Sequence, residues 1–144
     1  MSQPTQSIPI PARVLGGAGL IPFFAAALAA VWPGFADHDF ALRALIAYGA
    51  VILSFLGGVR WGLAIAERPD ALWGPLAVSV SPSLGGWVAL LLPAGTGLVL
   101  LALGFAGMVA LDGRLAAAPA WYRRLRLPLS AGAILALLVG LAAR

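Results

Sequence analysis

The sequence predicts an all-α fold, a polytopic membrane protein formed by a bundle of five transmembrane helices. Of the 144 residues, 62% are hydrophobic and only 10% are charged. This composition is typical of membrane proteins and leaves too few charges for the surface of a soluble domain. The hydrophobic residues fall into five runs, and the arginines gather on one side of these runs. We therefore expect a single transmembrane domain, residues 14–144, after a flexible, polar N-terminal tail, residues 1–13.

Each run ends at proline or charged residues, and each approaches the roughly 20 residues that a helix needs to cross a bilayer. The first run ends at Pro33, and the second ends at the polar segment 67–70 (ERPD). Only a Pro-Ala-Gly turn at 93–95 joins the third run to the fourth, which predicts a tight helical hairpin. The fourth run ends at Asp112, and the fifth ends at Arg144. The predicted spans are therefore about 14–32, 40–66, 76–92, 94–111 and 127–143.

The distribution of arginine predicts the orientation of these spans. With five spans, the N-terminus and the loops 67–75 and 112–126 share one side of the membrane. That side carries seven arginines, whereas the other side carries only Arg43 and Arg144; the seven are Arg13, Arg60, Arg68, Arg114, Arg123, Arg124 and Arg126. Arginine-rich loops stay in the cytoplasm. We therefore predict a bacterial cytoplasmic (inner) membrane protein with its N-terminus in the cytoplasm and its C-terminus in the periplasm.

Small residues recur every four positions in two of the spans. Small side chains allow helix backbones to approach closely, and such packing drives helix association in lipid. We therefore predict that the second and third helices pack through these rows, although glycine and alanine are also simply common in this chain. The rows are Ala50, Ser54, Gly58, Gly62 and Ala66 in the second span, and Ala77, Ser81, Gly85 and Ala89 in the third.

Arg60 lies inside an otherwise apolar run, where an unpaired charge is costly. Pro22 and Pro82 are expected at a similar depth, roughly 9–12 Å inside the cytoplasmic end at about 1.5 Å per residue. Each proline should kink its helix and free a carbonyl group. Freed carbonyls and serine hydroxyls could accept hydrogen bonds from the guanidinium. This pattern predicts a pocket for a ligand with an anionic or carbonyl head, formed by Arg60, Trp61, Ser54, Ser81, Ser83 and Trp87.

Arg60 has an alternative interpretation as an interface anchor. If the second helix ends near Gly58, Arg60 and Trp61 extend toward the lipid headgroups. Trp32, Trp73 and Trp121 fall at predicted span edges and are typical of the aromatic belt of a membrane protein.

The segment 121–126 (WYRRLR) carries aromatic and basic side chains just before the fifth span. Basic clusters at this position attract anionic lipids. We therefore predict headgroup contacts at the cytoplasmic surface by Trp121, Tyr122, Arg123, Arg124 and Arg126.

Metal, cofactor and catalytic sites are not predicted. The chain has no cysteine, and the Asp37-His38-Asp39 triplet lacks the usual spacing of metal ligands. Asp39 is better interpreted as a helix N-cap. No serine has a predicted base beside it, so we expect no enzymatic activity. We also expect no nucleic-acid partner, because the arginines flank hydrophobic runs and do not line one face.

Four segments resemble the transmembrane protein 69 family, a domain of unknown function found in proteobacteria and mitochondria. They are LGGAGLIPF (15–23), YGAVILSFLGGVRWG (48–62), SVSPSLGGW (79–87) and PAWYRRLRLPLS (119–130). The resemblance covers nearly the whole chain after residue 13, in the same order and at similar spacing. It implies a small inner-membrane protein of about five spans and no established activity.

These patterns favour a non-enzymatic accessory or assembly factor of a larger membrane complex. Short loops and small-residue faces fit contacts with membrane lipid and with the subunits of other membrane proteins. The alternative is a protein that binds or transports a small molecule or lipid in a pocket centred on Arg60, which requires a cavity among Arg60, Ser81, Ser83 and Trp87.

Overall fold

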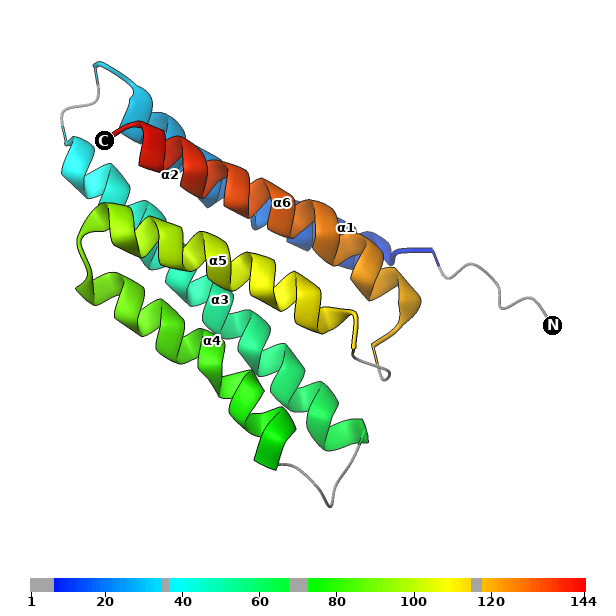
Figure 1. Ribbon diagram of the computed structural model, residues 1–144. Helices are drawn as coiled ribbons and strands as arrows, with labels where there is room; N and C mark the ends of the chain where they lie inside the picture. Colours follow the sequence, from blue (N-terminus) through cyan, green and yellow to red (C-terminus); the bar gives the residue numbers. More distant parts are fainter. Residues whose placement is uncertain (1–6, 35–36, 68–72, 115–117) are drawn as a thin grey trace.

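The computed structural model of the chain describes residues 7–34, 37–67, 73–114 and 118–144 (Figure 1). Five helices, with α1 and α2 together counted as one, are long and apolar enough to cross a membrane. The predicted five-helix, all-α fold is therefore confirmed. The elements within the described residues are α1 (Ile10–Ala18), α2 (Ile21–Val31), α3 (His38–Glu67), α4 (Trp73–Leu91), α5 (Ala94–Asp112) and α6 (Ala120–Ala142).

Successive spans run in opposite directions, and α3 is the central helix. It contacts α2, α4, α5 and α6. The start of α1, the end of α3 and the start of α6 lie at one end of the bundle, which we call the N-terminal end (Figure 1). With 30 residues, α3 is about 45 Å long, whereas the 19 residues of α5 span about 29 Å. The α3–α4 hairpin consequently extends beyond the end of α5 (Figure 1).

The core contains large apolar side chains from all the spans except α4. Phe23 of α2 lies edge-on to Tyr48 of α3 and to Phe105 of α5, with ring centroids 4.9 Å and 5.8 Å away. The outward surface is also apolar, and it includes Phe55 and Trp87. An apolar core together with an apolar exterior is what a hydrocarbon solvent requires, and it is rare on monomers that face water.

The first span is interrupted in its middle. α1 ends at Ala18, and Pro22 lies in the first turn of α2, where the missing proline N–H costs no helical hydrogen bond. The hydroxyl of Tyr48 donates to the carbonyl of Gly19 at 2.9 Å. The interruption is therefore tied to the central helix α3.

Pro82 lies inside α4 and is buried. A proline removes the hydrogen bond to the carbonyl four residues earlier, which here belongs to Val78. The hydroxyl of Ser81 donates to this carbonyl at 2.8 Å. Ser81 thus satisfies locally the carbonyl that the proline frees.

Several boundaries differ from the prediction, and α4 for example begins at Trp73 and not at residue 76. α6 begins at Ala120 and not near residue 127, so residues 120–126 of the predicted loop 112–126 belong to a helix. The helix can start early because Arg126 is paired inside the bundle and needs no water. α1 begins at Ile10, so residues 10–13 are helical, and residues 1–6 lie outside the described chain. Asp37 accepts a hydrogen bond from the backbone N–H of Phe40 at 2.7 Å, so Asp37, and not Asp39, caps α3.

Candidate functional site

The contact between α3 and α4 uses glycines one residue away from those predicted. A Cβ atom on Gly57 would overlap the carbonyl oxygen of Ser79, and one on Gly86 would lie 3.0 Å from the carbonyl oxygen of Ala50. The predicted packing roles of Gly58, Gly62 and Gly85 are therefore wrong. A Cβ atom on any of these three would meet nothing within 4 Å among the described residues. Ala89 is buried, but its carbonyl faces Gly97 of α5.

The structure does not assemble the predicted pocket around Arg60. Ser54 and Ser83 share a hydrogen bond of 2.8 Å across the α3–α4 interface. Ser81 is exposed, and Trp61 and Trp87 face outward with 41% and 59% of their surface exposed. The pocket prediction is wrong because these side chains bond to one another or point outward, away from Arg60.

Arg60 instead lies on the side of α3 that faces α5 and α6. It is 8% exposed, so the interpretation as a surface anchor is also wrong. Its Nη1 lies 3.4 Å from Oδ1 of Asp112, at the end of α5, and the Nε of Arg126 donates to Oδ2 of the same carboxylate at 2.9 Å. We call these three residues the Arg60–Asp112–Arg126 cluster.

The Arg60–Asp112–Arg126 cluster is buried and unevenly charged. Asp112 is 3% exposed and Arg126 is 7% exposed, and two guanidinium groups share one carboxylate. Nε of Arg60 and Nη2 of Arg126 are buried and have no hydrogen-bond partner among the described residues. A buried charge is stable only when it is paired and hydrogen-bonded, so the cluster retains both positive charge and unused donors.

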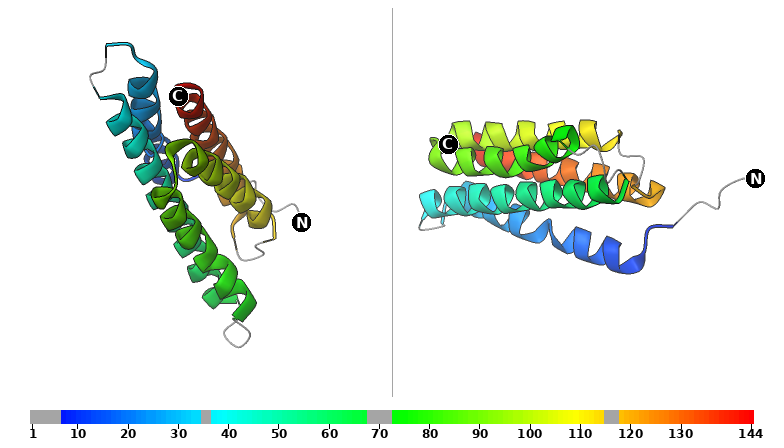
Figure 2. Two further views of the ribbon diagram at one scale, coloured as in Figure 1. Left: turned by 60° about the vertical axis from the view of Figure 1, so that its left-hand side comes forward. Right: turned by 90° about the horizontal axis from the view of Figure 1, so that it is seen from below.

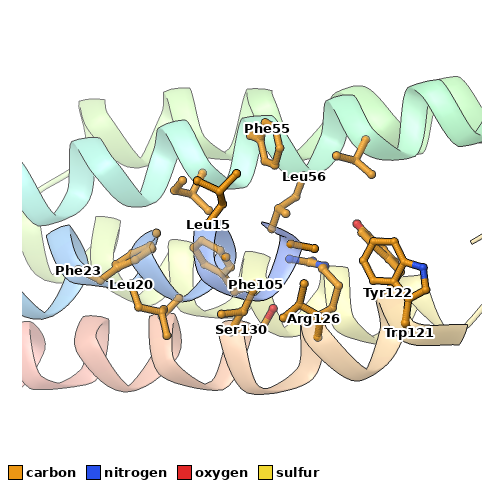
Figure 3. Close-up of a pocket in the computed structure, with 18 residues that line it drawn as sticks. Leu15, Leu20, Phe23, Phe55, Leu56, Phe105, Trp121, Tyr122, Arg126 and Ser130 are labelled. Carbon is orange, nitrogen blue, oxygen red and sulfur yellow. The ribbon is translucent and has the colours of Figure 1, made fainter. Parts of the chain in front are cut away.

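A cavity of about 350 Å³ opens beside this cluster (Figure 3). It lies between the first span, α3 and α6, and most of its walls are apolar. Figure 2 shows the reason for the space, because α1 tilts away from α3 toward the N-terminal end (right-hand view). The lining includes Leu15, Leu20 and Phe23 of the first span, Ile52, Phe55, Leu56 and Val59 of α3, Phe105 of α5, and Leu125, Leu129 and Ala133 of α6.

Polar atoms enter this cavity mainly from α6. Trp121, Tyr122, Arg126 and Ser130 all line it, and the guanidinium carbon of Arg126 lies 6.0 Å from the centre of the Tyr122 ring. In Figure 3, Arg126 extends from α6 toward Leu56 of α3. Ser130 is 2% exposed, and its hydroxyl, like Nη2 of Arg126, has no partner in the described part of the chain.

The residues predicted to contact lipid headgroups therefore separate into three groups. Arg123 and Arg124 are exposed at the start of α6, where headgroup contact stays a prediction. For Arg126 the prediction is wrong, since its guanidinium is inside the bundle and paired with Asp112. Trp121 and Tyr122 are half-buried and line the cavity.

Asp112 and Ser130 are the functional candidates that sequence reasoning missed. Asp112 precedes Gly113 and Arg114 and so resembles the polar end of a span, and Ser130 is a common type of residue in membrane helices. One feature of the sequence points to a missing carboxylate. Arg60 and Arg126 both lie in or beside an apolar run, and neither has a predicted carboxylate partner. Among the residues that the structure describes, no group of three His, Cys, Asp or Glu side chains could hold a metal ion.

Comparisons with known proteins agree with the resemblance noted above. Residues 8–142 match a family described as a protein of unknown function (DUF3429). Transmembrane protein 69 of Xenopus tropicalis is 43% identical over 137 residues, which is 90% of this chain and 53% of that protein. Transmembrane protein 69 of Mus musculus is 42% identical over 87 residues, covering 58% of this chain and 34% of that protein. The chain thus spans about half the length of these relatives or less. No solved structure matches the chain.

Proposed function

Since this chain belongs to the transmembrane protein 69-like family of membrane proteins, whose description assigns no activity, we propose a function from its own geometry. The protein binds a small amphipathic molecule from the bilayer in the cavity between the first span, α3 and α6. The observation that carries the proposal is that Arg126 and Ser130 line a largely apolar cavity, while Nη2 of Arg126 and the hydroxyl of Ser130 are buried without a partner among the described residues.

The size and lining of the cavity support this proposal. Its volume of about 350 Å³ falls within the range of roughly 300–1,000 Å³ typical of small-molecule sites, which combine apolar walls with a few polar groups. The walls suit an alkyl chain or ring. The polar atoms of α6 suit a head that accepts hydrogen bonds. The site lies on the opposite side of α3 from the serines of α4, so it is centred on Arg126 and not on Arg60.

Tryptophan fluorescence tests binding directly. Trp121 lines the cavity, whereas Trp32, Trp61, Trp73 and Trp87 are exposed and can be changed to Phe, so that Trp121 alone reports. In detergent micelles, at a fixed ratio to detergent, 2,3-dibromoundecanoic acid, which carries its bromines beside the head, should quench this fluorescence in a saturable way. Quenching that only rises in proportion to the bromine in the micelle would contradict the proposal.

Variants that fill the cavity provide the control. Ala133 of α6 is buried and Ala12 of α1 is half-buried, and both line the cavity. Ala133→Phe and the milder Ala12→Phe should each abolish the saturable component, whereas Ala77→Phe, at an exposed site on α4, should preserve it. Equal quenching in all three variants would show that the probe binds elsewhere.

The accessory or assembly role predicted from the sequence is a second candidate. The observation that favours it is the open space beside Gly58, Gly62 and Gly85, because a helix of another subunit can approach closely over glycine. Native mass spectrometry of the protein from gently solubilised membranes should then show a larger assembly, which Gly62→Leu should disrupt. Recovery of the chain alone would count against this role.

A location in the bacterial inner membrane, with the N-terminus in the cytoplasm, is also part of the proposal. Arg60 and Arg126 do not support this orientation, because both are buried, and Arg68 lies outside the described residues. The support comes from four exposed arginines at the N-terminal end, Arg13, Arg114, Arg123 and Arg124, against Arg43 and Arg144 at the other end. Positive charge of this kind favours the cytoplasmic side.

A further inference from the structure

We infer that the cavity selects amphiphiles with a carboxylate head, bound by Nη2 of Arg126 and the hydroxyl of Ser130. This inference rests on the proposed binding function and adds the chemical class of the ligand. The alkyl tail lies along the apolar walls formed by the first span and α3.

The charge of the Arg60–Asp112–Arg126 cluster calls for a monoanion. Two guanidinium groups face a single carboxylate, and arginine stays protonated in proteins. The cluster thus carries a net positive charge while each of its members is at most 8% exposed. A carboxylate placed against Arg126 would balance this charge where water is excluded, whereas a neutral head would leave it unbalanced.

The polar atoms that lack a hydrogen-bond partner also match a carboxylate head, both in number and in type. Nη2 of Arg126 can only donate, and the hydroxyl of Ser130 can donate as well. Arg126 and Ser130 are four residues apart in α6, so they occupy one face of the helix. A carboxylate offers two acceptor oxygens, one for each donor, and hydrogen bonds to a charged group are the strong ones. Asp112 already engages Nε of Arg126 and thereby orients the guanidinium.

The apolar lining continues from these donors toward the middle of the bundle. Ser130 lies ten residues into α6, which is about 15 Å from its start, and Ala133 lies about 20 Å from it. Phe23 and Ile52 line the cavity together with Ala133. A single alkyl chain therefore finds an apolar path beyond its head.

The experiment compares three probes on the variant in which Trp121 is the only tryptophan. 2,3-Dibromoundecanoic acid, its methyl ester and 2,3-dibromoundecanol share one brominated chain and differ only in the head. Their bromines lie beside the head, on the side of the site nearer to Trp121, since the tail runs toward Ala133. We expect the acid to bind at least tenfold more tightly than the ester or the alcohol, because a hydrogen bond to a charged group is worth more than a neutral one. Lauric acid should displace the brominated acid more effectively than dodecyl phosphate does.

Ser130→Ala is the most informative variant. The hydroxyl that it removes has no partner within the described chain, so the substitution should not unfold the protein. It should weaken binding of the acid about tenfold and binding of the alcohol by less, because a hydrogen bond to a neutral head is worth less than one to a charged head. Ser81→Ala, on the exposed face of α4, is the matched control and should change neither. Arg126→Lys, which keeps the charge but loses the planar fork, should weaken the acid further.

The outcomes separate this inference from the proposed function. Saturable and equal binding of acid, ester and alcohol would overturn the carboxylate head but retain the binding site. Tighter binding of dodecyl phosphate than of lauric acid would identify a phosphate head and also overturn it. If no probe gave saturable quenching, both the site and the head would be wrong.

Discussion

Asp112 and Arg126 lie fourteen residues apart in the sequence, yet Nε of Arg126 donates to Oδ2 of Asp112 at 2.9 Å. This contact joins the last turn of α5 to the second turn of α6 across the link between them. It explains why an arginine near the membrane surface is 7% exposed. The same contact positions the guanidinium at the wall of the cavity.

Replacement of Asp112 should be the most destabilising change in the cluster. Asp112→Asn removes the carboxylate that both arginines share and leaves two buried cations without a counter-ion. The loss of one partner of a buried ion pair typically costs about 3–5 kcal/mol of unfolding free energy. Thermal unfolding in detergent, followed by circular dichroism, measures the effect.

The control for Asp112→Asn replaces the whole cluster. The triple variant Arg60→Met, Asp112→Leu, Arg126→Met leaves no buried charge, and well-packed apolar residues commonly substitute for buried ion pairs without loss. Its melting temperature should exceed that of Asp112→Asn. If Asp112→Asn were as stable as the parent protein, the cluster would not be a buried ionic contact.

The two arginines should not contribute equally to stability. The Arg126 contact is 2.9 Å long, whereas the Arg60 contact is 3.4 Å long, which is at the weak end for a hydrogen bond. Arg126→Ala should therefore lower the melting temperature more than Arg60→Ala. Arg43→Ala, at an exposed site on α3, should cost about 0–1 kcal/mol and serves as the reference. The opposite ranking of Arg60 and Arg126 would contradict the geometry.

Two adjacent glycines of α3 provide a matched pair. The Cβ atom of Gly57→Ala would overlap the backbone of α4 at Ser79, whereas that of Gly58→Ala would meet open space. Gly57→Ala should lower the free energy of unfolding by about 1–3 kcal/mol, as overpacking does. Gly58→Ala should be neutral or raise it by about 0.4–1 kcal/mol, because alanine restricts the unfolded chain. Unfolding of the two variants in a denaturant series compares them, and similar values would refute the assigned interface.

The orientation can be tested with single cysteines, since the chain contains none. Ser7 precedes α1 and Gly113 follows α5, at the N-terminal end, whereas Gly34 lies between α2 and α3, at the opposite end. In intact bacterial cells, a membrane-impermeant maleimide should label only Gly34→Cys. In inside-out vesicles it should label only the other two. Labelling of Ser7→Cys in intact cells would reverse the proposed orientation.

The number and approximate limits of the spans could be predicted from the sequence, because they follow from hydrophobicity and length. The register of the helix contacts could not. Gly57 and Gly58 are adjacent, as are Gly85 and Gly86, so each helix offers a glycine in either register. Only the three-dimensional packing of α3 against Ser79 and Gly86 distinguishes them.

The Arg60–Asp112–Arg126 cluster could not be predicted from the sequence, for a different physical reason. From the sequence, the depth of a residue can be measured only from the end of its own span, which treats all ends as lying in one plane. However, α3 extends beyond α5, so Arg60, seven residues inside α3, meets Asp112 in the last turn of α5. A contact between the interior of one helix and the end of another depends on this difference in length, which hydropathy does not reveal.

The tilt of α1 determines how a molecule can reach the cavity. α1 contains no buried residue, yet Leu15 and Gly16 help to enclose the space beside α6. This wall is therefore held by the fewest interior contacts and faces the acyl chains. A ligand that passes beside α1 never enters water. The occupancy of the cavity therefore follows the mole fraction of the ligand among the lipids and not its aqueous concentration.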